Sequence, residues 1–194
     1  MKYYILYKPF GYLSQFSDED NNPGLGQILD VEKDIYPVGR LDKDSEGLLI
    51  LTNDKNLNSR LLNPIFKHRR IYNAQVDREV NKEAIGHLKS GVSIKLGKSK
   101  YLTLPAEARA IEEPVLPERN PPVRFRKNVP TSWVEIKLTE GKNRQVRKMC
   151  AAVGFPCLRL VRVAIENLEL GDLPVGGIKE ITQEELSPLL GLRL

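Results

Sequence analysis

The aspartate at position 42 is the first residue whose type and setting could do chemistry. Asp42 follows Arg40 and Leu41 in a loop-like stretch that leads directly into the apolar run 47–52. A loop held at the end of a rigid strand positions reactive groups accurately, so Asp42 is placed where a nucleophile or a general base would be useful. The alternative is an aspartate that only hydrogen-bonds its own turn. The spacing leaves both interpretations open.

A cationic stripe is the second candidate. Arg144, Arg147 and Lys148 are spaced at i, i+3 and i+4, so a helix over about 143–153 would carry them on one face. A solvated charged face is the ordinary explanation of such a stripe. If Arg147 faced Asp42, its charge would favour the ionised carboxylate and make it available as a nucleophile or base.

The surroundings of this stripe are strongly basic. Between residues 119 and 148 the only acids are Glu135 and Glu140. The cations in and beside this window are Arg119, Arg124, Arg126, Lys127, Lys137, Lys142, Arg144, Arg147, Lys148, Arg159 and Arg162. Such a concentration of positive charge is the electrostatic footprint of binding to a phosphate backbone. The proline-rich stretch 112–130 is either part of that binding surface or an unstructured exposed loop.

The composition predicts a basic globular protein. Its 194 residues include 30 Lys and Arg against 25 Asp and Glu, with 41% hydrophobic residues and a pI near 9.1. These values exclude a disordered chain and predict a surface that attracts polyanions. The apolar stretch 3–7 is too short for a signal peptide or a membrane span, so we expect a cytoplasmic protein. The two cysteines and two histidines cannot supply a zinc site at the usual spacing, and Cys150 is expected to be buried.

The elements that would position these residues alternate between strand-like and helix-like segments. Strands are predicted at 3–7, 47–52, 68–76, 101–104, 106–111, 133–138, 158–163 and 165–170. Helices are predicted at 57–62, between Asn81 and Gly91, over about 143–153, and after Thr182, which forms a capping-box pair with Glu185. The pattern predicts an α+β fold with a mixed, largely antiparallel sheet and flanking helices and loops.

Four groups of residues resemble, in chain order, the motifs of the pseudouridine synthases of the small-subunit rRNA synthase family. The resemblance runs from about residue 3 to residue 170, and its two long motifs are highly specific. The groups are Lys8-Pro9-Phe10-Gly11, then Gly39-Arg40-Leu41-Asp42 with the run 47–54, then Arg70-Ile71-Tyr72, then Glu140-Gly141-Lys142-Asn143-Arg144-Gln145-Val146-Arg147-Lys148-Met149.

This resemblance implies a fold and a reaction. The fold would be that of a pseudouridine synthase, a single catalytic domain over 1–194 whose two lobes form a central RNA-binding cleft. The reaction would convert a uridine within RNA to pseudouridine, by breaking the glycosidic bond and rejoining the ribose to carbon 5 of the ring. It needs no cofactor. A base inside a paired stem is unreachable, so the target nucleotide must be flipped out.

The resemblance also implies roles for individual residues. Asp42 matches the catalytic carboxylate, Tyr72 the tyrosine that stacks on the target ring, and Arg147 the basic residue that pairs with the carboxylate. Arg40 helps to occupy the space that the flipped nucleotide leaves. Contacts with RNA phosphates are then expected from the basic residues around this motif and from the proline-rich stretch: Lys142, Arg144, Lys148, Arg124 and Arg126.

The first strand is expected to begin at residue 3, which leaves no room for the amino-terminal S4-type RNA-binding module that many family members carry. The chain therefore resembles the shorter members that modify large-subunit rRNA. We expect a monomer that acts on free ribosomal RNA or on a pre-ribosomal particle and that has no membrane partner.

Three alternatives remain beside this expectation. The chain could modify small-subunit rRNA or tRNA, or it could be a non-catalytic RNA-binding or ribosome-assembly factor. A pure binder would have no reason to keep Asp42, Tyr72 and Arg147 together, which favours the enzyme. A metal-dependent nuclease that uses Asp42 and Asp44 is disfavoured, because two acids without further ligands make a poor two-metal site.

Overall fold

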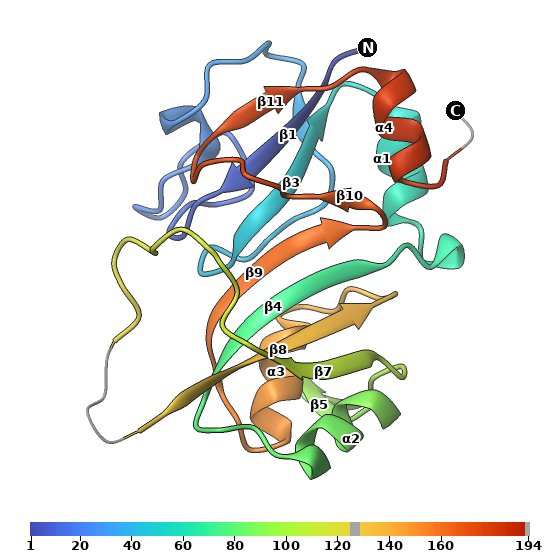
Figure 1. Cartoon of the computed structure of the whole chain (residues 1–194). Coiled ribbons are helices and arrows are strands. Elements are labelled where there is room, and N and C mark those ends of the chain that lie inside the picture. Colours follow the sequence, from blue (N-terminus) through green and yellow to red (C-terminus); the bar gives the residue numbers. More distant parts are fainter. Residues whose placement is uncertain (125–128, 193–194) are drawn as a thin grey trace. The chain divides into compact units, whose positions relative to one another are not determined.

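The computed structural model describes residues 1–124 and 129–192, and the chain divides into two compact units. Unit 1 comprises Met1–His68 and Arg162–Leu194, and unit 2 comprises Arg69–Val161 (Figure 1). Asp42 and Arg40 therefore belong to unit 1, whereas Tyr72 and the basic motif belong to unit 2.

Unit 1 is organised around a sheet with the strand order β11-β1-β3-β9. These strands are β1 (Tyr3–Lys8), β3 (Glu46–Thr52), β9 (Cys157–Ile165) and β11 (Ile178–Glu180), and β1 is antiparallel to both β3 and β11. Residues 162–165 of β9 belong to unit 1, and residues 157–161 of the same strand belong to unit 2. Two short strands, β2 (Tyr36–Pro37) and β10 (Leu168–Glu169), pair with β3 and β9. The helical elements are η1 (Leu25–Gln27), α1 (Lys55–Leu62), η2 (Pro64–Phe66) and α4 (Gln183–Leu189).

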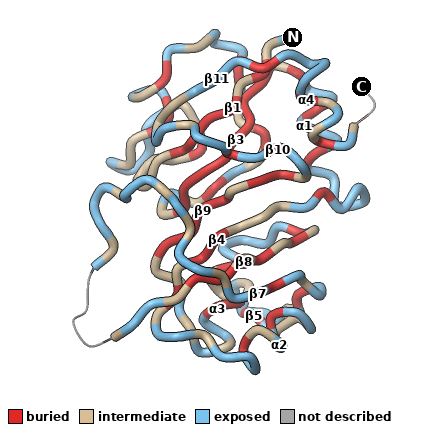
Figure 2. The backbone as a smooth tube through the Cα atoms, viewed as in Figure 1, coloured by how far each residue is buried: buried red, intermediate tan, exposed pale blue. Residues whose placement is uncertain are grey.

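Strand β3 is buried at every position, as its nearly continuous apolar sequence predicts (Figure 2). Leu49 and Leu51 pack in one core cluster with Leu6 of β1 and with Leu25 and Ile35. The loop that carries Asp42 ends where this strand begins, so its anchor is a strand with no solvent-exposed face.

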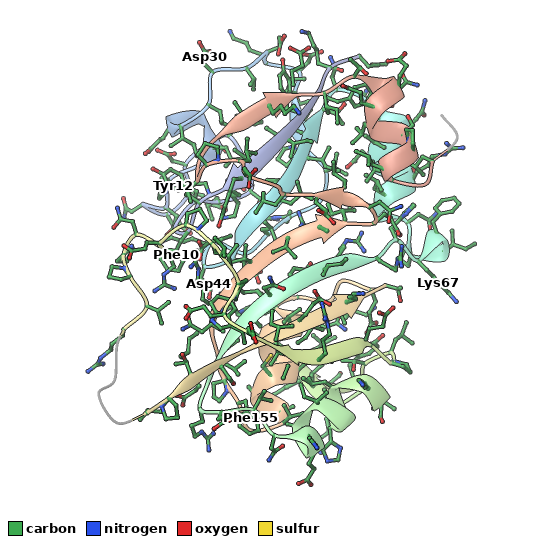
Figure 3. The ribbon with its side chains drawn as sticks, viewed as in Figure 1. Phe10, Tyr12, Asp30, Asp44, Lys67 and Phe155 are labelled. Carbon is green, nitrogen blue, oxygen red and sulfur yellow. The ribbon has the colours of Figure 1, made fainter. Side chains whose placement is uncertain are left out.

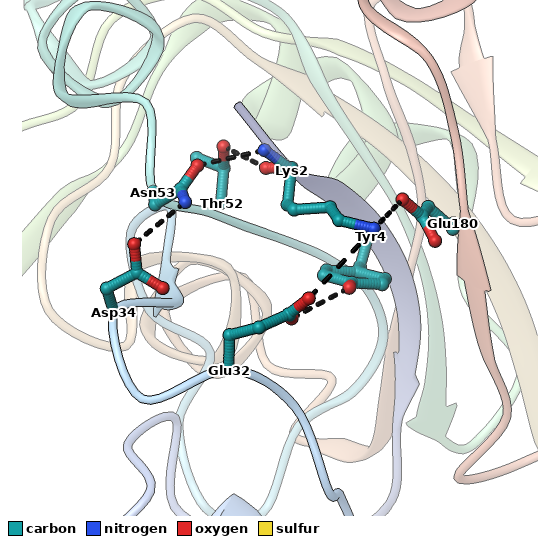
Figure 4. A network of polar contacts seen from close by, with 7 residues as sticks. All are labelled: Lys2, Tyr4, Glu32, Asp34, Thr52, Asn53 and Glu180. Atoms are coloured by element: carbon teal, nitrogen blue, oxygen red, sulfur yellow. Dashed lines mark hydrogen bonds and ion pairs between the residues drawn. The ribbon is translucent and has the colours of Figure 1, made fainter.

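A polar network surrounds the first residues of β1 at the surface of unit 1 (Figure 4). The backbone N–H of Lys2 donates to Asn53 Oδ1 at 2.9 Å, and the Thr52 hydroxyl donates to the Lys2 carbonyl at 2.6 Å. Lys2 Nζ reaches Glu180 of β11 at 2.6 Å, and the Tyr4 hydroxyl donates to Glu32 at 2.9 Å. These bonds fix the register of the three neighbouring strands far from the Asp42 loop.

Unit 2 contains a second run of strands, in the order β9-β4-β8-β7, and two helices. Strand β8 (Thr131–Leu138) is antiparallel to both β4 (Arg70–Asp77) and β7 (Glu107–Ile111). Strands β5 (Ser93–Leu96) and β6 (Ser99–Leu102) form a separate hairpin. The core lies between these strands and the apolar faces of α2 (Lys82–Ser90) and α3 (Gln145–Ala152), which contribute Leu88, Val146 and Met149.

The predicted α+β class with a largely antiparallel sheet is confirmed. The buried Cys150, the Asn81 cap of α2 and the capping box of Thr182 and Glu185 were also predicted correctly. The strand expected over 165–170 is confirmed only in part, as β10 at Leu168–Glu169, because Glu166 takes a left-handed backbone conformation (φ 50°) that ends β9 at Ile165. Among the described residues, no helix combines the length and the apolar character that crossing a membrane requires.

Gly47 lies where β3 packs closely against the backbone of Arg162 in β9, so a substitution there tests this close approach. Its φ is +105°, and a Cβ atom there would lie 2.3 Å from the carbonyl oxygen of Arg162. Gly154 has a similar φ of +89° with open space around it. We expect Gly154→Ala to cost about 1–2 kcal/mol for the left-handed backbone alone, and Gly47→Ala to cost at least ~2 kcal/mol more because the strands must separate. Urea unfolding measures both, and equal costs would contradict the close approach.

Candidate active site

The loop that carries Asp42 is held by hydrogen bonds on both sides of that residue. The Ser14 hydroxyl donates to the Leu41 carbonyl at 2.8 Å and accepts from the Leu41 N–H at 2.9 Å. The Ser45 N–H donates to the Asp42 carbonyl at 3.0 Å, and the Gly11 N–H donates to the Lys43 carbonyl at 2.8 Å. Three consecutive residues therefore have fixed backbone partners, which orients the half-buried Asp42 before any ligand arrives.

Lys8 is a buried cation that the sequence did not single out. Its side chain is fully buried at the end of β1, and its Nζ donates to the carbonyls of Pro9 at 2.8 Å and Tyr12 at 2.7 Å. Burial lowers the pKa of Lys8 to about 7, against the raising effect of the carboxylates of Glu46, Asp44 and Asp42. The labelled Phe10, Tyr12 and Asp44 in Figure 3 belong to this part of unit 1.

The position of Lys8 explains why sequence reasoning missed it. A lysine at the end of an apolar strand is ordinarily an exposed flank, and only its place in the first motif could have pointed to a role. Its amine instead holds the carbonyls of the turn after β1, while its electrostatic partners are the acids of the Asp42 loop.

Arg40 is exposed and lies immediately after a glycine with a left-handed backbone. Gly39 has a φ of +72°, and a Cβ atom there would come within 2.9 Å of Leu62 Cδ2, at the end of α1. The structure thus gathers Arg40, Asp42, Lys8 and the end of α1 within unit 1.

The two other predicted catalytic residues lie in unit 2. Tyr72 is on β4, half-buried and packed against the core cluster of this unit. Arg147 is on α3 and is also half-buried, and its Nη1 donates to the Cys157 carbonyl at 3.2 Å. The guanidinium of Arg147 is therefore anchored to the start of β9, whereas its predicted pairing with Asp42 stays a prediction.

The turn before α3 is organised by Glu140, a buried carboxylate that accepts three hydrogen bonds. The donors are the Tyr101 hydroxyl at 2.6 Å, the Leu104 N–H at 2.9 Å and Gln145 Nε2 at 2.6 Å. Gln145 in turn accepts from the Lys142 N–H at 2.8 Å. Sequence reasoning quoted Glu140 and Gln145 as parts of the motif and gave them no role. Their structural role is to set where α3 begins.

Because α3 begins at Gln145, one feature of the predicted cationic stripe is wrong. Arg144 precedes the helix and has a left-handed backbone (φ 53°), so it does not share a helical face with Arg147 and Lys148. The Gln145 contacts start the helix about two residues later than the periodicity indicated.

The predicted RNA-contacting cations differ in their exposure to solvent. Arg124, Lys142 and Arg144 are exposed, and Lys142 Nζ lies 4.9 Å from the centre of the Tyr101 ring. Lys148 is half-buried, and its Nζ donates to the Asn143 carbonyl at 2.8 Å, so part of its role is to close the turn. Arg126, like Lys127, lies outside the described residues.

The proline-rich stretch is anchored over much of its described part. Arg119 donates to the carbonyls of Pro121 at 2.8 Å and Pro122 at 3.1 Å, and its Nη1 contacts the Leu158 carbonyl at 3.4 Å. Arg159 of β9 donates to the Pro117 carbonyl at 2.8 Å. Two arginines that the sequence assigned to a phosphate-binding surface thus hold this stretch against β9.

No group of three or more His, Cys, Asp or Glu side chains within residues 1–124 and 129–192 is arranged to hold a metal ion. Asp42 and Asp44 are the acids of interest in this loop, and the charges of both raise the pKa of Lys8.

Comparison with known proteins gives concordant matches. A family model described as RNA pseudouridylate synthase matches residues 2–152. The chain is 48% identical to "Ribosomal large subunit pseudouridine synthase E" of Vibrio parahaemolyticus, over 93% of this chain and 74% of that protein. It is 45% identical to the protein of the same name from Xanthomonas campestris pv. campestris, over 89% of this chain and 91% of that protein. The solved "Crystal structure of pseudouridylate synthase" matches with a TM-score of 0.79 at 25% identity, over 97% of this chain and 73% of that one.

The lowered pKa of Lys8 predicts a pH dependence of stability. The pKa is about 7 in the folded protein against 10.5 for a free lysine, so the folded state binds fewer protons between these values. The free energy of unfolding therefore increases as the pH rises from about 7 to 10.5. Lys8 contributes at most about 1.4 kcal/mol per pH unit to this increase. Below pH 7 both states are protonated and this slope vanishes.

Urea unfolding at several pH values from 6 to 10 measures this slope. The Lys8→Met variant should be less stable, because two carbonyls lose their donor, and its slope should be shallower than that of the wild type. The control Lys98→Met removes an exposed lysine and should keep the wild-type slope. Identical slopes for all three proteins would contradict the shifted pKa.

Proposed function

The chain belongs to the RNA pseudouridylate synthase family, and on that basis we propose that it isomerises one uridine of large-subunit ribosomal RNA to pseudouridine. The observation that carries the choice of substrate is the 45–48% identity, over most of both chains, to relatives named as large-subunit synthases. The substrate is this RNA, free or within an assembling particle in the cytoplasm, and the enzyme acts as a monomer.

Asp42 is the catalytic carboxylate in this proposal. It either attacks the anomeric carbon or removes a proton from the ribose, and in both cases the bond between N1 and the ribose breaks. The freed uracil anion then rotates and forms a bond from carbon 5 to the ribose. This bond displaces the Asp42 carboxylate from the anomeric carbon in the first route, and the ribose regains its proton from Asp42 in the second. Carbon 5 then loses its proton, and N1 gains one. The fixed backbone around Asp42 supports this role, because the chain that carries the carboxylate is ordered before the substrate binds.

Tyr72 and Arg147 complete the proposed catalytic set. Tyr72 would stack on the target ring, and Arg147 would keep the carboxylate of Asp42 ionised. The anchoring of Arg147 to Cys157 and the Glu140 contacts that start α3 support a fixed position for this guanidinium within unit 2. Such preorganised charge stabilises the uracil anion better than mobile groups can.

The exposed cations would hold the RNA around the flipped nucleotide. Arg40 occupies the space that the flipped base leaves, and Lys142, Arg144 and Arg124 contact phosphates. Lys148 contributes both to the turn and to the RNA, and Arg126 belongs to the same set on sequence grounds alone.

Pseudouridine mapping tests the proposal as a whole. Carbodiimide adducts read by primer extension are compared on large- and small-subunit rRNA from cells with and without the gene. We expect one large-subunit site to disappear in the deletion strain and to return with the wild-type gene. An unchanged large-subunit map with a lost small-subunit or tRNA site would replace the proposed substrate.

Asp42→Asn isolates the catalytic carboxylate. The amide has nearly the same shape but cannot act as a nucleophile or base, so we expect kcat to fall by at least about 10³-fold while RNA binding persists. The control Asp44→Asn changes the next acid of the same loop and should keep most of the turnover. Substantial activity of Asp42→Asn would remove this residue from its proposed role.

Arg144→Ala tests phosphate contact by an exposed arginine. We expect weaker RNA binding and a salt dependence of log Kd that is flatter by about one phosphate contact. Arg109→Ala is the matched control, because Arg109 is also exposed but lies on β7, outside the basic motif. Filter binding at several salt concentrations gives both slopes, and an unchanged slope for Arg144→Ala would speak against the contact.

A further inference from the structure

The residues that follow α1 display an apolar turn to solvent. In this apolar turn, residues 62–67, the exposed fractions are 43% for Leu62, 74% for Ile65 and 53% for Phe66. A single exposed apolar side chain is ordinary, but three large ones within five residues are a patch. Such a patch indicates a surface that meets a ligand.

The backbone of the apolar turn is ordered by its own hydrogen bonds. Asn63 Oδ1 accepts from the Ile65 N–H at 3.0 Å, and Pro64 begins the 3-10 helix η2. Lys67 ends η2 with a left-handed backbone (φ 49°), and its N–H donates to the Pro64 carbonyl at 3.2 Å. Ile65 and Phe66 are thus presented in one conformation, which reduces the entropy lost when they bind a partner.

The apolar turn adjoins the loop of Arg40 and Asp42 within unit 1. Leu62 Cδ2 lies 2.9 Å from the position that a Cβ of Gly39 would take, and Arg40 is the next residue. An RNA strand held at Arg40 would therefore lie beside this turn. Figure 3 labels Lys67 at the outer end of the same turn.

The charge around the apolar turn suits a polyanion. The segment 55–76 contains no Asp or Glu and five basic residues, namely Lys55, Arg60, Lys67, Arg69 and Arg70. Lys55, Arg60 and Lys67 belong to unit 1 and are exposed. Apolar side chains next to exposed cations match the chemistry of unpaired RNA, which offers flat bases and phosphates together.

We propose that the apolar turn is a stacking site for an unpaired base of the RNA substrate, next to the target uridine. Phe66 stacks on the base, Leu62 and Ile65 cover its edge, and Arg60 and Lys67 contact the neighbouring phosphates. This inference rests on the proposed RNA substrate and adds a binding element outside the catalytic set. Flipping one nucleotide unstacks its neighbours, and the turn offers one of them a new partner.

Steady-state kinetics of Phe66 variants tests the stacking. The substrate is rRNA extracted from cells that lack the gene. We expect Phe66→Ala to raise KM about tenfold, the loss typical of one base–aromatic stack, with kcat nearly unchanged. Phe66→Trp should keep the wild-type KM, and Phe66→Leu, which stays apolar but has no ring, should resemble Phe66→Ala. The control Leu102→Ala removes an apolar side chain of unit 2 that is 69% exposed, and it should leave KM unchanged.

Phe66→Trp supplies a second readout that a structural role would not give. The chain has one other tryptophan, Trp133, which is 5% exposed in the core of unit 2. Stacking on a base quenches tryptophan emission, so fluorescence of Phe66→Trp should fall when RNA is added, and that of the wild type should not. Melting temperatures close to the wild type would exclude unfolding as the cause of any loss.

The outcomes separate this inference from the proposed function. If the wild type forms no pseudouridine in either rRNA, the proposed function fails whatever the Phe66 variants do. If the wild type is active and Phe66→Ala has the wild-type KM, the stacking site alone is wrong. If Phe66→Ala binds naked rRNA normally but no longer binds assembling ribosomal particles, the turn contacts a protein, which also overturns the inference.

Discussion

The buried amine of Lys8 orders the turn from which Gly11 and Ser14 hold the Asp42 loop. A lysine with no exposed surface costs free energy unless its donors find acceptors, and here the carbonyls of Pro9 and Tyr12 provide them. A neutral amine keeps two N–H donors, so both bonds survive when the proton leaves near pH 7. The acids Asp42, Asp44 and Glu46 favour the charged form, which couples the protonation of this amine to the charge of the candidate site.

Unit 2 also contains a buried ionisable group with hydrogen-bond partners, but this group is an acid. The Glu140 carboxylate is buried, and donors from Tyr101, Leu104 and Gln145 surround it. These three bonds join β6, the segment after it and the first turn of α3, so the helix that carries Arg147 starts at a defined residue. In both units a buried ionisable group, and not only apolar packing, determines where a candidate catalytic residue sits.

The basic residues fall into two classes that their charge alone does not distinguish. Arg119 and Arg159 donate to backbone carbonyls and stabilise the proline-rich stretch, whereas Lys148 closes a turn and also belongs to the proposed RNA-binding set. Arg40, Lys142 and Arg144 are exposed, as are Arg60 and Lys67 beside the apolar turn. RNA binding in the proposed function therefore depends on fewer cations than the composition indicates. The salt dependence of binding should come mainly from these few residues, and single substitutions can test each of them.

The sequence by itself determined the family, the α+β class and the residues worth testing, because motifs and hydrophobic period are local properties of the chain. It also predicted the continuous burial of β3 and the caps of α2 and α4. Only the tertiary structure decided that Lys8 is buried and that Gln145, not Arg144, begins α3. It also decided that Leu62 lies against Gly39. Each of these depends on partners distant in sequence or on competing hydrogen bonds, and neither residue type nor spacing encodes them.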